Sequence, residues 1–170
     1  MNEQDKKTLC VAGTSGLVGS NITRAALLRG YQINGTMRDC SDHAKAPFLK
    51  ALDGGDRLNL FAADMSIDGD FDEATRGADG LFIATLIPVY KGPTGTLAKE
   101  MDDEQGYREI IMPTVNGCLN IMRSAVRNGV NKIVICSSTS STNPIPPVSV
   151  KNEVDHWSDE NAQCRAKKYT

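Results

Sequence analysis

Several residue types that mark specialised classes of protein are scarce in this chain of 170 residues. It has two histidines, His43 and His156, and neither has a partner at the spacing of metal ligands. Its five cysteines are widely spaced, odd in number and never form a CxxC pair, so a disulfide framework and a zinc site are excluded and we expect no bound metal. Three cysteines stand within apolar runs and are expected to be buried as small hydrophobic residues: Cys10, Cys118 and Cys136.

Long apolar runs and clusters of positive charge are also missing. The longest nearly uncharged apolar stretch, residues 80–90, is far shorter than the roughly 20 residues of a membrane helix, and residues 1–7 are polar rather than signal-like. Nineteen Lys and Arg against 21 Asp and Glu give a net charge of −2, and the longest basic run is Lys167-Lys168. Phosphate backbones and anionic lipids require a positive footprint. We therefore expect a cytoplasmic protein that binds neither nucleic acid nor membranes.

What the sequence does contain is an alternation of short apolar runs and helical periods. A composition of 40% hydrophobic and 24% charged residues is that of one globular domain, which we expect to span residues 1–170. Helices are expected over Leu17–Leu28, where Gly30 offers a stop, and over 46–52 and 72–76. The predicted strands are Thr8–Ala12, Gln32–Met37, Leu58–Ala62, 81–84 and 132–136. This order predicts an α/β fold with a doubly wound parallel sheet, whose ligands bind at the carboxyl ends of the strands.

A longer helix is predicted over residues 105–128, closed by Gly129. Pro113 leaves two alternatives, because proline suits a first-turn position but kinks a helix interior. The same apolar pattern fits either a buried helix in a monomer or the interface of a homodimer, so the oligomeric state stays open. The apolar positions that recur at steps of three and four are Ile111, Val115, Leu119, Met122 and Val126.

A glycine turn joins the first predicted strand to the first predicted helix. Gly13, Gly16 and Gly19 form GxxGxxG, which supplies a tight turn, a close approach of the backbone to a pyrophosphate, and close packing of helix on strand. The helix then offers its unpaired amides to the anion. An ordinary strand-to-helix turn is the alternative. We predict that a dinucleotide cofactor is bound by Gly13, Thr14, Ser15, Gly16, Leu17, Val18 and Gly19.

The end of the second strand predicts which dinucleotide is bound. An acidic residue about 20 residues after the turn normally binds the ribose 2′-hydroxyl of NAD, whereas an arginine there accommodates the 2′-phosphate of NADP. This chain has Arg38 followed by Asp39, and Lys45 lies one short loop later. Two cations could flank one phosphate, so we favour NADP over NAD. The alternative is that Arg38 is a solvated surface charge neutralised by Asp39.

Six motifs in order resemble the extended short-chain dehydrogenases/reductases, and most of all their dihydroflavonol reductase and cinnamoyl-CoA reductase group. The resemblance runs from about residue 8 to residue 170 and implies a Rossmann-type fold and NADP(H)-dependent reduction of a small-molecule carbonyl. The motifs are the glycine turn, Gly35-Thr36-Met37-Arg38-Asp39, Ala63-Asp64-Met65, Phe82-Ile83-Ala84-Thr85, Pro113-Thr114-Val115-Asn116-Gly117 and Val134-Ile135-Cys136-Ser137-Ser138.

The resemblance also implies roles for single residues near the cofactor. Asp64 and Met65 would contact the adenine, and Asn116 would lie in the central helix behind the active site. Asp64 could instead cap a turn, and Asn116 could be an ordinary surface residue. The residues that would line the cofactor beside the fourth strand are Ile83, Ala84, Thr85 and Leu86.

A serine and a tyrosine would carry the chemistry in this family. The serine orients the substrate carbonyl, and the tyrosine exchanges the proton once a lysine four residues later has lowered its pKa toward neutrality. Ser138 and Tyr169 match these positions, although the serine-rich run could be an ordinary polar loop. The matching lysine would be residue 173, so we expect a domain truncated before its last strands and substrate subdomain, and inactive alone.

Two classes of function therefore stay open. The first is an NADP(H)-dependent reductase of a ketone, aldehyde or thioester, which Ser138 and Tyr169 favour. The second is a non-catalytic Rossmann module that senses a dinucleotide or binds a partner. An epimerase of the same family is a third alternative, but such relatives usually take NAD, and Arg38 speaks against it.

Overall fold

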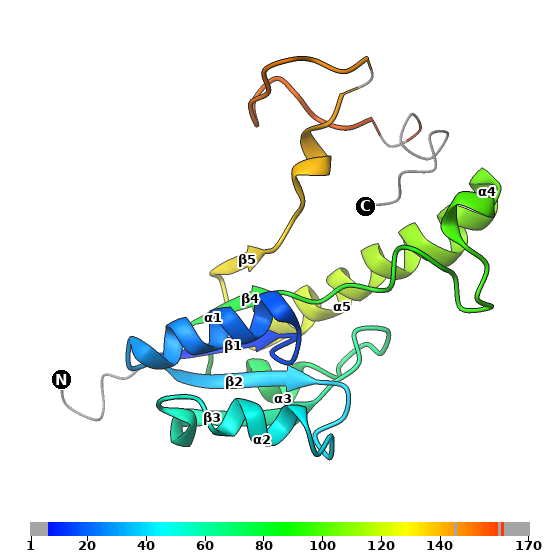
Figure 1. Cartoon of the computed structure of the whole chain (residues 1–170). Helices are drawn as coiled ribbons and strands as arrows, with labels where there is room; N and C mark the ends of the chain where they lie inside the picture. Colours follow the sequence, from blue (N-terminus) through cyan, green and yellow to red (C-terminus); the bar gives the residue numbers. More distant parts are fainter. Residues whose placement is uncertain (1–6, 145, 160, 162–170) are drawn as a thin grey trace. The chain divides into compact units, whose positions relative to one another are not determined.

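Five parallel strands form one sheet in the order β3-β2-β1-β4-β5 (Figure 1). Val11 of β1 lies beside Gly35 of β2 on one side and Phe82 of β4 on the other, so the strand order reverses at β1 and β4. In doubly wound sheets a ligand binds beyond the carboxyl ends of the strands at such a reversal. The strands are β1 Thr8–Ala12, β2 Gln32–Met37, β3 Leu58–Ala62, β4 Gly80–Ile83 and β5 Ile133–Ile135.

The computed structural model describes residues 7–144, 146–159 and 161. The chain divides into two compact units, and the sheet belongs to the first, which comprises Met1–Leu86 and Gly117–Cys136. The second comprises Ile87–Asn116 and Ser137–Thr170. Each unit has its own hydrophobic cluster.

Helices connect the strands as the sequence predicts. The first helix, α1 Leu17–Leu28, lies along β1 and β2 and ends before Gly30, whose φ is 85°. The short helix α2 Lys45–Lys50 packs against β3, and α3 Asp72–Thr75 against β2. Three strands match their predicted bounds, and β4 begins one residue earlier than predicted, at Gly80.

The predicted long helix is divided into three parts. α4 Asp103–Gly106 leads into a π-helical turn over Tyr107–Ile111, and α5 Met112–Arg127 follows. Pro113 is the second residue of α5 and follows the π-helical turn within one continuous helical stretch. The regular α-helical part thus begins beside Pro113, as one alternative predicts, and the helix is irregular immediately before the proline, where its missing N–H would otherwise interrupt the ladder.

The main hydrophobic cluster of the first unit packs α1 and α2 against β1, β2 and β3. Its fully buried members are Val11, Leu27, Ile33, Leu49 and Leu58. Cys10 is also buried, as predicted, and burial raises the pKa of its thiol to about 12. Its thiol is therefore a core group and not a nucleophile.

The burial prediction for Cys136 is wrong, because Cys136 is exposed, and Cys118 on α5 is only half-buried. The run 132–136 has the composition of a buried strand, but Val134 is 52% exposed and Ile135 is also exposed. Among the described residues β5 pairs with β4 alone and forms the edge of the sheet, so fewer neighbours cover its side chains.

The second unit holds a small folded insertion after β4. Lys91 and Leu97 form an antiparallel bridge, and the Asp102 carboxylate caps α4 by accepting a hydrogen bond from the backbone N–H of Gln105 at 2.7 Å. A separate 3₁₀ turn, Thr139–Thr142, follows the serine-rich run. The insertion packs around a cluster of Ala98, Met101, Ile110 and Val89.

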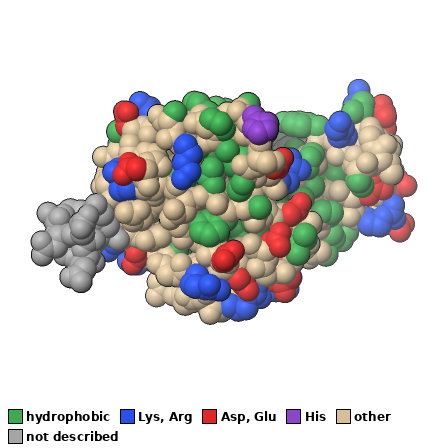
Figure 2. Space-filling model, turned by 90° about the horizontal axis from the view of Figure 1, so that it is seen from below, with side chains coloured by type: hydrophobic (Ala, Val, Ile, Leu, Met, Phe, Trp, Pro, Cys, Tyr) green, Lys and Arg blue, Asp and Glu red, His purple; other side chains and the backbone are tan. Residues whose placement is uncertain are grey.

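The surface carries charges of both signs. On the face in Figure 2, acidic and basic side chains are interspersed among polar and apolar ones. This is what a net charge of −2 on 40 charged residues predicts, and that face carries no large field of one sign. Within the described residues, no helix combines the length and apolar character needed to cross a bilayer.

An ion-pair cluster that joins α3 to the end of α5 yields a test of acid stability. The Arg127 guanidinium lies 2.8 Å from Asp72 Oδ1 and 3.2 Å from Asp68 Oδ1. Its hydrogen bond lowers the pKa of Asp72, so the pair stabilises the fold above the unfolded pKa of about 4 and loses that contribution as pH falls through the lowered value. We expect Arg127→Ala to lower the free energy of unfolding at pH 7 and the difference to disappear in strong acid.

Urea unfolding across that pH range measures this difference. Arg123→Ala is the control, because Arg123 also lies on α5 but donates to the neutral Asn120 side chain. A loss for Arg127→Ala that stays constant down to strong acid would show that Arg127 acts through packing instead of its charge.

Candidate functional site

The glycine turn lies where β1 ends, against the carboxyl end of β4. Gly13 has a φ of 87°, and a Cβ there would stand 2.7 Å from Thr85 Cβ and 2.9 Å from the Ala84 carbonyl oxygen. A Cβ at Gly19 would overlap the Gly13 carbonyl, 2.8 Å from its carbon. The fold therefore requires glycine at both positions. A Cβ at Gly16 would meet the Gly13 carbonyl oxygen at an ordinary 3.4 Å, so packing alone does not demand this glycine.

The amino end of α1 is open to an anion. Gly16 is the extended residue that precedes the helix, and among the described residues no side chain caps it and no acidic residue occupies the first turn. The unpaired amides and the positive end of the helix dipole therefore face solvent. Leu17 is 83% exposed and Val18 is also exposed beside these amides. These residues fit a bound dinucleotide phosphate, which needs free N–H groups and close backbone approach.

Thr14 has a different place from its neighbours in the turn. Its side chain is fully buried, and its hydroxyl is hydrogen-bonded to that of Thr23 on α1 at 2.5 Å. Any contact of Thr14 with a cofactor would therefore pass through its backbone. Ser15 and Gly16 are the more accessible members of the turn.

Two residues of β2 hold the turn in place, a role that the sequence analysis did not assign to them although both belong to one of the six motifs. The Thr36 hydroxyl accepts a hydrogen bond from the Gly13 N–H at 3.2 Å, and the Thr36 carbonyl accepts one from the Thr14 N–H at 2.9 Å. Gly35 is buried where a Cβ would stand 2.9 Å from Thr14 Cγ2. A glycine inside a strand often marks such a close approach, and this signal could have identified Gly35.

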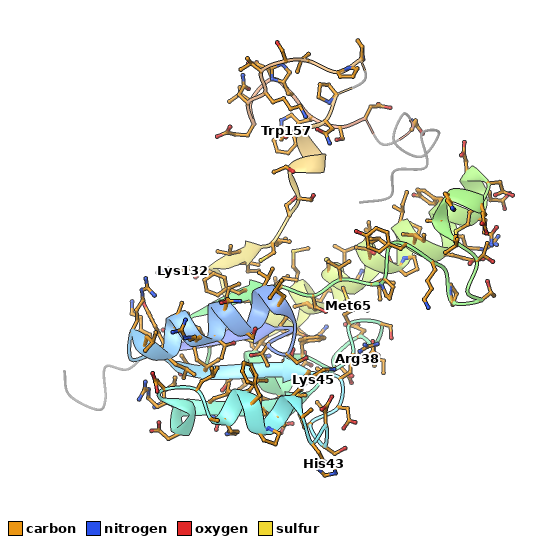
Figure 3. All side chains as sticks on the ribbon, viewed as in Figure 1. Arg38, His43, Lys45, Met65, Lys132 and Trp157 are labelled. Atoms are coloured by element: carbon orange, nitrogen blue, oxygen red, sulfur yellow. The ribbon has the colours of Figure 1, made fainter. Side chains whose placement is uncertain are left out.

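Arg38 lies at the carboxyl end of β2 and is exposed (Figure 3). The adjacent Asp39 carboxylate accepts hydrogen bonds from the N–H and hydroxyl of Ser41, at 2.8 and 2.6 Å, and these bonds lower its pKa. Among the ion pairs of the described residues, none includes Arg38. Lys45, at the start of α2, pairs with Asp42 at 3.3 Å. Arg38 is thus the cation that is more open to a phosphate.

Asp64 and Met65 follow the carboxyl end of β3, which lies at the same end of the strands as Arg38. The Asp64 carboxylate caps a turn by accepting from the N–H and hydroxyl of Ser66, at 2.8 and 2.7 Å. These bonds, with a smaller contribution from Arg38, lower the pKa of Asp64. Met65 is buried, and its carbonyl accepts from Asn120 Nδ2 at 3.1 Å. The turn-capping role of Asp64 is therefore observed, and its contact with an adenine stays a prediction.

The four residues at the end of β4 have different surroundings. Ile83 is buried, and the Ala84 N–H donates to the Ala12 carbonyl at 2.9 Å, which fixes this backbone beside the turn. Thr85 contacts Gly13, whereas Leu86 is exposed. The fold thus brings the predicted cofactor-lining segment and the glycine turn together.

Of the predicted catalytic residues, the structure describes Ser138, which belongs to the second unit. Ser138 is exposed, and its carbonyl accepts from the Ser141 N–H at 3.0 Å and from the Ser141 hydroxyl at 2.7 Å. Tyr169 lies outside the described residues. Asn116 is exposed on α5. The roles of these three residues stay predictions.

Comparison with known proteins gives the family. A domain family described as NAD(P)H-binding matches residues 13–169. Tetraketide alpha-pyrone reductase 1 of Arabidopsis thaliana is 38% identical over 141 residues, which cover 82% of this chain and 40% of that protein. Dihydroflavonol 4-reductase of Hordeum vulgare is 36% identical over 169 residues, covering 98% of this chain and 44% of that protein.

Solved structures show the same architecture. Vestitone reductase from alfalfa has a TM-score of 0.66 and 25% identity, over 96% of this chain and 49% of that structure. Yeast methylglyoxal/isovaleraldehyde reductase complexed with NADPH has a TM-score of 0.70 and 20% identity, over 95% of this chain and 50% of that structure, which supports the fold alone. The chain spans about two fifths of the length of the curated relatives it matches. It belongs to the NAD(P)H-binding extended short-chain dehydrogenases/reductases.

Proposed function

We propose that this protein is an oxidoreductase that uses NADP(H) to reduce a ketone, aldehyde or thioester carbonyl to an alcohol. The observation that supports the cofactor choice is Arg38, an exposed cation with no ion pair among the described residues, at the end of the second strand, where an arginine in this type of fold accommodates the 2′-phosphate of NADP. The relatives named above are reductases, which supports the reaction class.

The chemistry assigns one role to each of two hydroxyl groups. A bound NADPH would supply hydride chemistry, and reducing a carbonyl in this way would leave an alkoxide oxygen that needs a proton. In this proposal the Tyr169 phenol gives that proton, and the Ser138 hydroxyl donates a hydrogen bond to the same oxygen. A phenol with an ordinary pKa near 10 needs a nearby cation to exchange protons at neutral pH.

Cofactor titration with an Arg38→Ala variant tests the cofactor part. Removing a charge-assisted hydrogen bond costs about 1.5–3 kcal/mol, so we expect NADPH affinity to fall roughly 10- to 100-fold and NADH affinity to change little. Calorimetry or nicotinamide fluorescence measures both. Arg24→Ala is the matched control, because Arg24 is an exposed arginine further along α1.

Two results would contradict this proposal. Equal loss of NADH and NADPH affinity in Arg38→Ala would show that Arg38 supports the turn and does not read the phosphate. NADPH binding without consumption of NADPH on any carbonyl, in a protein that includes the matching lysine, would favour a non-catalytic dinucleotide sensor.

A further inference from the structure

Two residues with opposite cofactor preferences follow β2 one after the other. Arg38 is the first residue beyond the strand, and Asp39 is the next. In this type of fold an acidic residue about 20 residues after the glycine turn binds the ribose 2′-hydroxyl of NAD, whereas an arginine there accommodates the 2′-phosphate of NADP. Each of the two could also cancel the other by forming an ion pair. The cofactor preference therefore depends on which of them is available to the ribose.

The Asp39 carboxylate is already bound within its own loop. Its Oδ1 accepts one hydrogen bond from the Ser41 hydroxyl at 2.6 Å and another from the Ser41 N–H at 2.8 Å. These bonds, the hydroxyl bond first, lower the pKa of Asp39, so the carboxylate stays charged at neutral pH. None of the ion pairs of the described residues joins Asp39 to Arg38, although the two are neighbours in the chain.

The second carboxylate of this loop is held in a different way. Asp42 Oδ1 accepts from the backbone N–H groups of Ala44 and Lys45 at 3.0 and 2.9 Å, and Asp42 Oδ2 lies 3.3 Å from Lys45 Nζ. Figure 3 labels Arg38 where the loop leaves β2 and Lys45 where it enters α2. Of these two carboxylates, Asp39 is the one that accepts from a hydroxyl side chain. Its bond can therefore be removed without altering the backbone.

We propose that Ser41 determines the preference for NADP(H), because its hydroxyl keeps the Asp39 carboxylate within the loop and so leaves Arg38 to the 2′-phosphate. Once released, Asp39 would repel that phosphate and could accept a hydrogen bond from the 2′-hydroxyl of NAD. Ser41 is thus a positioning residue, which acts through Asp39. This inference rests on the proposed function, in which Arg38 binds the phosphate.

Ser41→Ala tests the proposal in titrations of the whole chain with NADPH and with NADH. We expect NADPH affinity to fall, NADH affinity to rise, and their ratio to shift about tenfold, because a hydrogen bond to a charged group is lost while the Ser41 N–H bond stays. A change that only disturbed the loop would lower both affinities. Ser41→Thr keeps a hydroxyl and is expected to keep the ratio. Ser41 is exposed, so thermal unfolding should be unchanged in both variants.

A second substitution removes the charge on which Ser41 acts. In an Asp39→Asn background no carboxylate can be released, so we expect Ser41→Ala to leave the ratio of affinities unchanged there. Ser66→Ala is the matched control, because the Ser66 N–H and hydroxyl donate to Asp64 at 2.8 and 2.7 Å in the same arrangement after β3. Asp64 is expected beside the adenine, which both cofactors share, so both affinities should change equally.

Two results would overturn the proposal. One is an equal change of both affinities in Ser41→Ala, and the other is a shift of their ratio that persists in the Asp39→Asn background, since Ser41 would then act on the shape of the loop. Arg38→Ala, measured beside them, separates this inference from the proposed function. Unchanged NADPH affinity in Arg38→Ala contradicts the proposed phosphate site itself. Weaker NADPH binding there, with an unchanged ratio in Ser41→Ala, contradicts only the role of Ser41.

Discussion

Replacing Gly19 with alanine is expected to lower the free energy of unfolding by about 3 kcal/mol and to remove measurable NADPH binding. The added methyl group would overlap the carbonyl of Gly13, 2.8 Å from its carbon. That carbonyl also accepts the Gly16 N–H at 3.0 Å, so moving it away would disturb the turn itself. Because the added methyl group would meet backbone atoms, no flexible side chain can move aside to relieve the overlap.

Helix propensity acts in the opposite direction, so the sign of the measured change in stability shows which of the two effects is larger. Gly19 lies in the first turn of α1, and alanine is favoured over glycine within a helix by about 1 kcal/mol. A methyl group forced into a backbone carbonyl destabilises the fold by more than that, because even milder overpacking of a well-packed site costs about 1–3 kcal/mol of stability. Urea unfolding of Gly19→Ala measures the balance, and a gain in stability would show that α1 can shift away from the turn.

Gly16→Ala is the matched control within the same motif. A Cβ at Gly16 has 3.4 Å to the nearest oxygen and points into an exposed region. We expect its stability to change by less than about 1 kcal/mol, because no backbone overlap arises. We still expect weaker NADPH binding, because a side chain would stand where the backbone approaches the phosphate. The two variants together separate what the fold needs from what the cofactor needs.

The strands and the glycine turn could be predicted because their signals are local. Apolar runs bounded by charged residues or glycine identified the bounds of β1, β2 and β3. The spacing of the three glycines identified the turn, and the end of β2 identified Arg38 as a phosphate ligand or a surface charge. No ion pair among the described residues includes Arg38, which favours the interpretation that it is a phosphate ligand.

The remaining features depend on contacts between distant parts of the chain. The inward orientation of Thr14 rests on Thr23, and the position of the turn rests on Thr36 of β2, 23 residues after Gly13. The predicted burial of Cys136 is wrong because the run 132–136 has the composition of a central strand but stands at the edge of the described sheet. Composition predicts that a residue can be buried, and only its neighbours determine whether it is.

One buried polar contact links the sheet to α3 and yields the second large effect. Asn34 of β2 is 8% exposed, and its Nδ2 donates a hydrogen bond to the Ala74 carbonyl of α3 at 2.9 Å. In Asn34→Asp an ionised carboxylate would face that carbonyl with no proton to donate. Burying an unpaired charge costs several kcal/mol, and we expect a loss of about 4 kcal/mol at pH 7.

The loss should depend on pH in a definite direction. Burial and the facing carbonyl raise the folded pKa of the new carboxyl above its unfolded value of about 3.9, so the folded state keeps the proton longer. Stability relative to the wild type therefore falls as pH rises from about 4 toward the raised pKa, by up to about 1.4 kcal/mol per pH unit. Below about pH 4 both states are protonated, and the carboxylic acid can donate to Ala74 as the amide did.

Asn59→Asp is the matched control, because Asn59 of β3 pairs in register with Asn34 but is exposed. Its carboxylate stays hydrated, so we expect a change within about 0.5 kcal/mol at any pH. Urea unfolding of both variants between acid and neutral pH separates burial from position in the sheet. If the Asn34→Asp curve were as flat as that of Asn59→Asp, the bond to Ala74 would open at little cost, and α3 would be held by the Arg127 cluster rather than by β2.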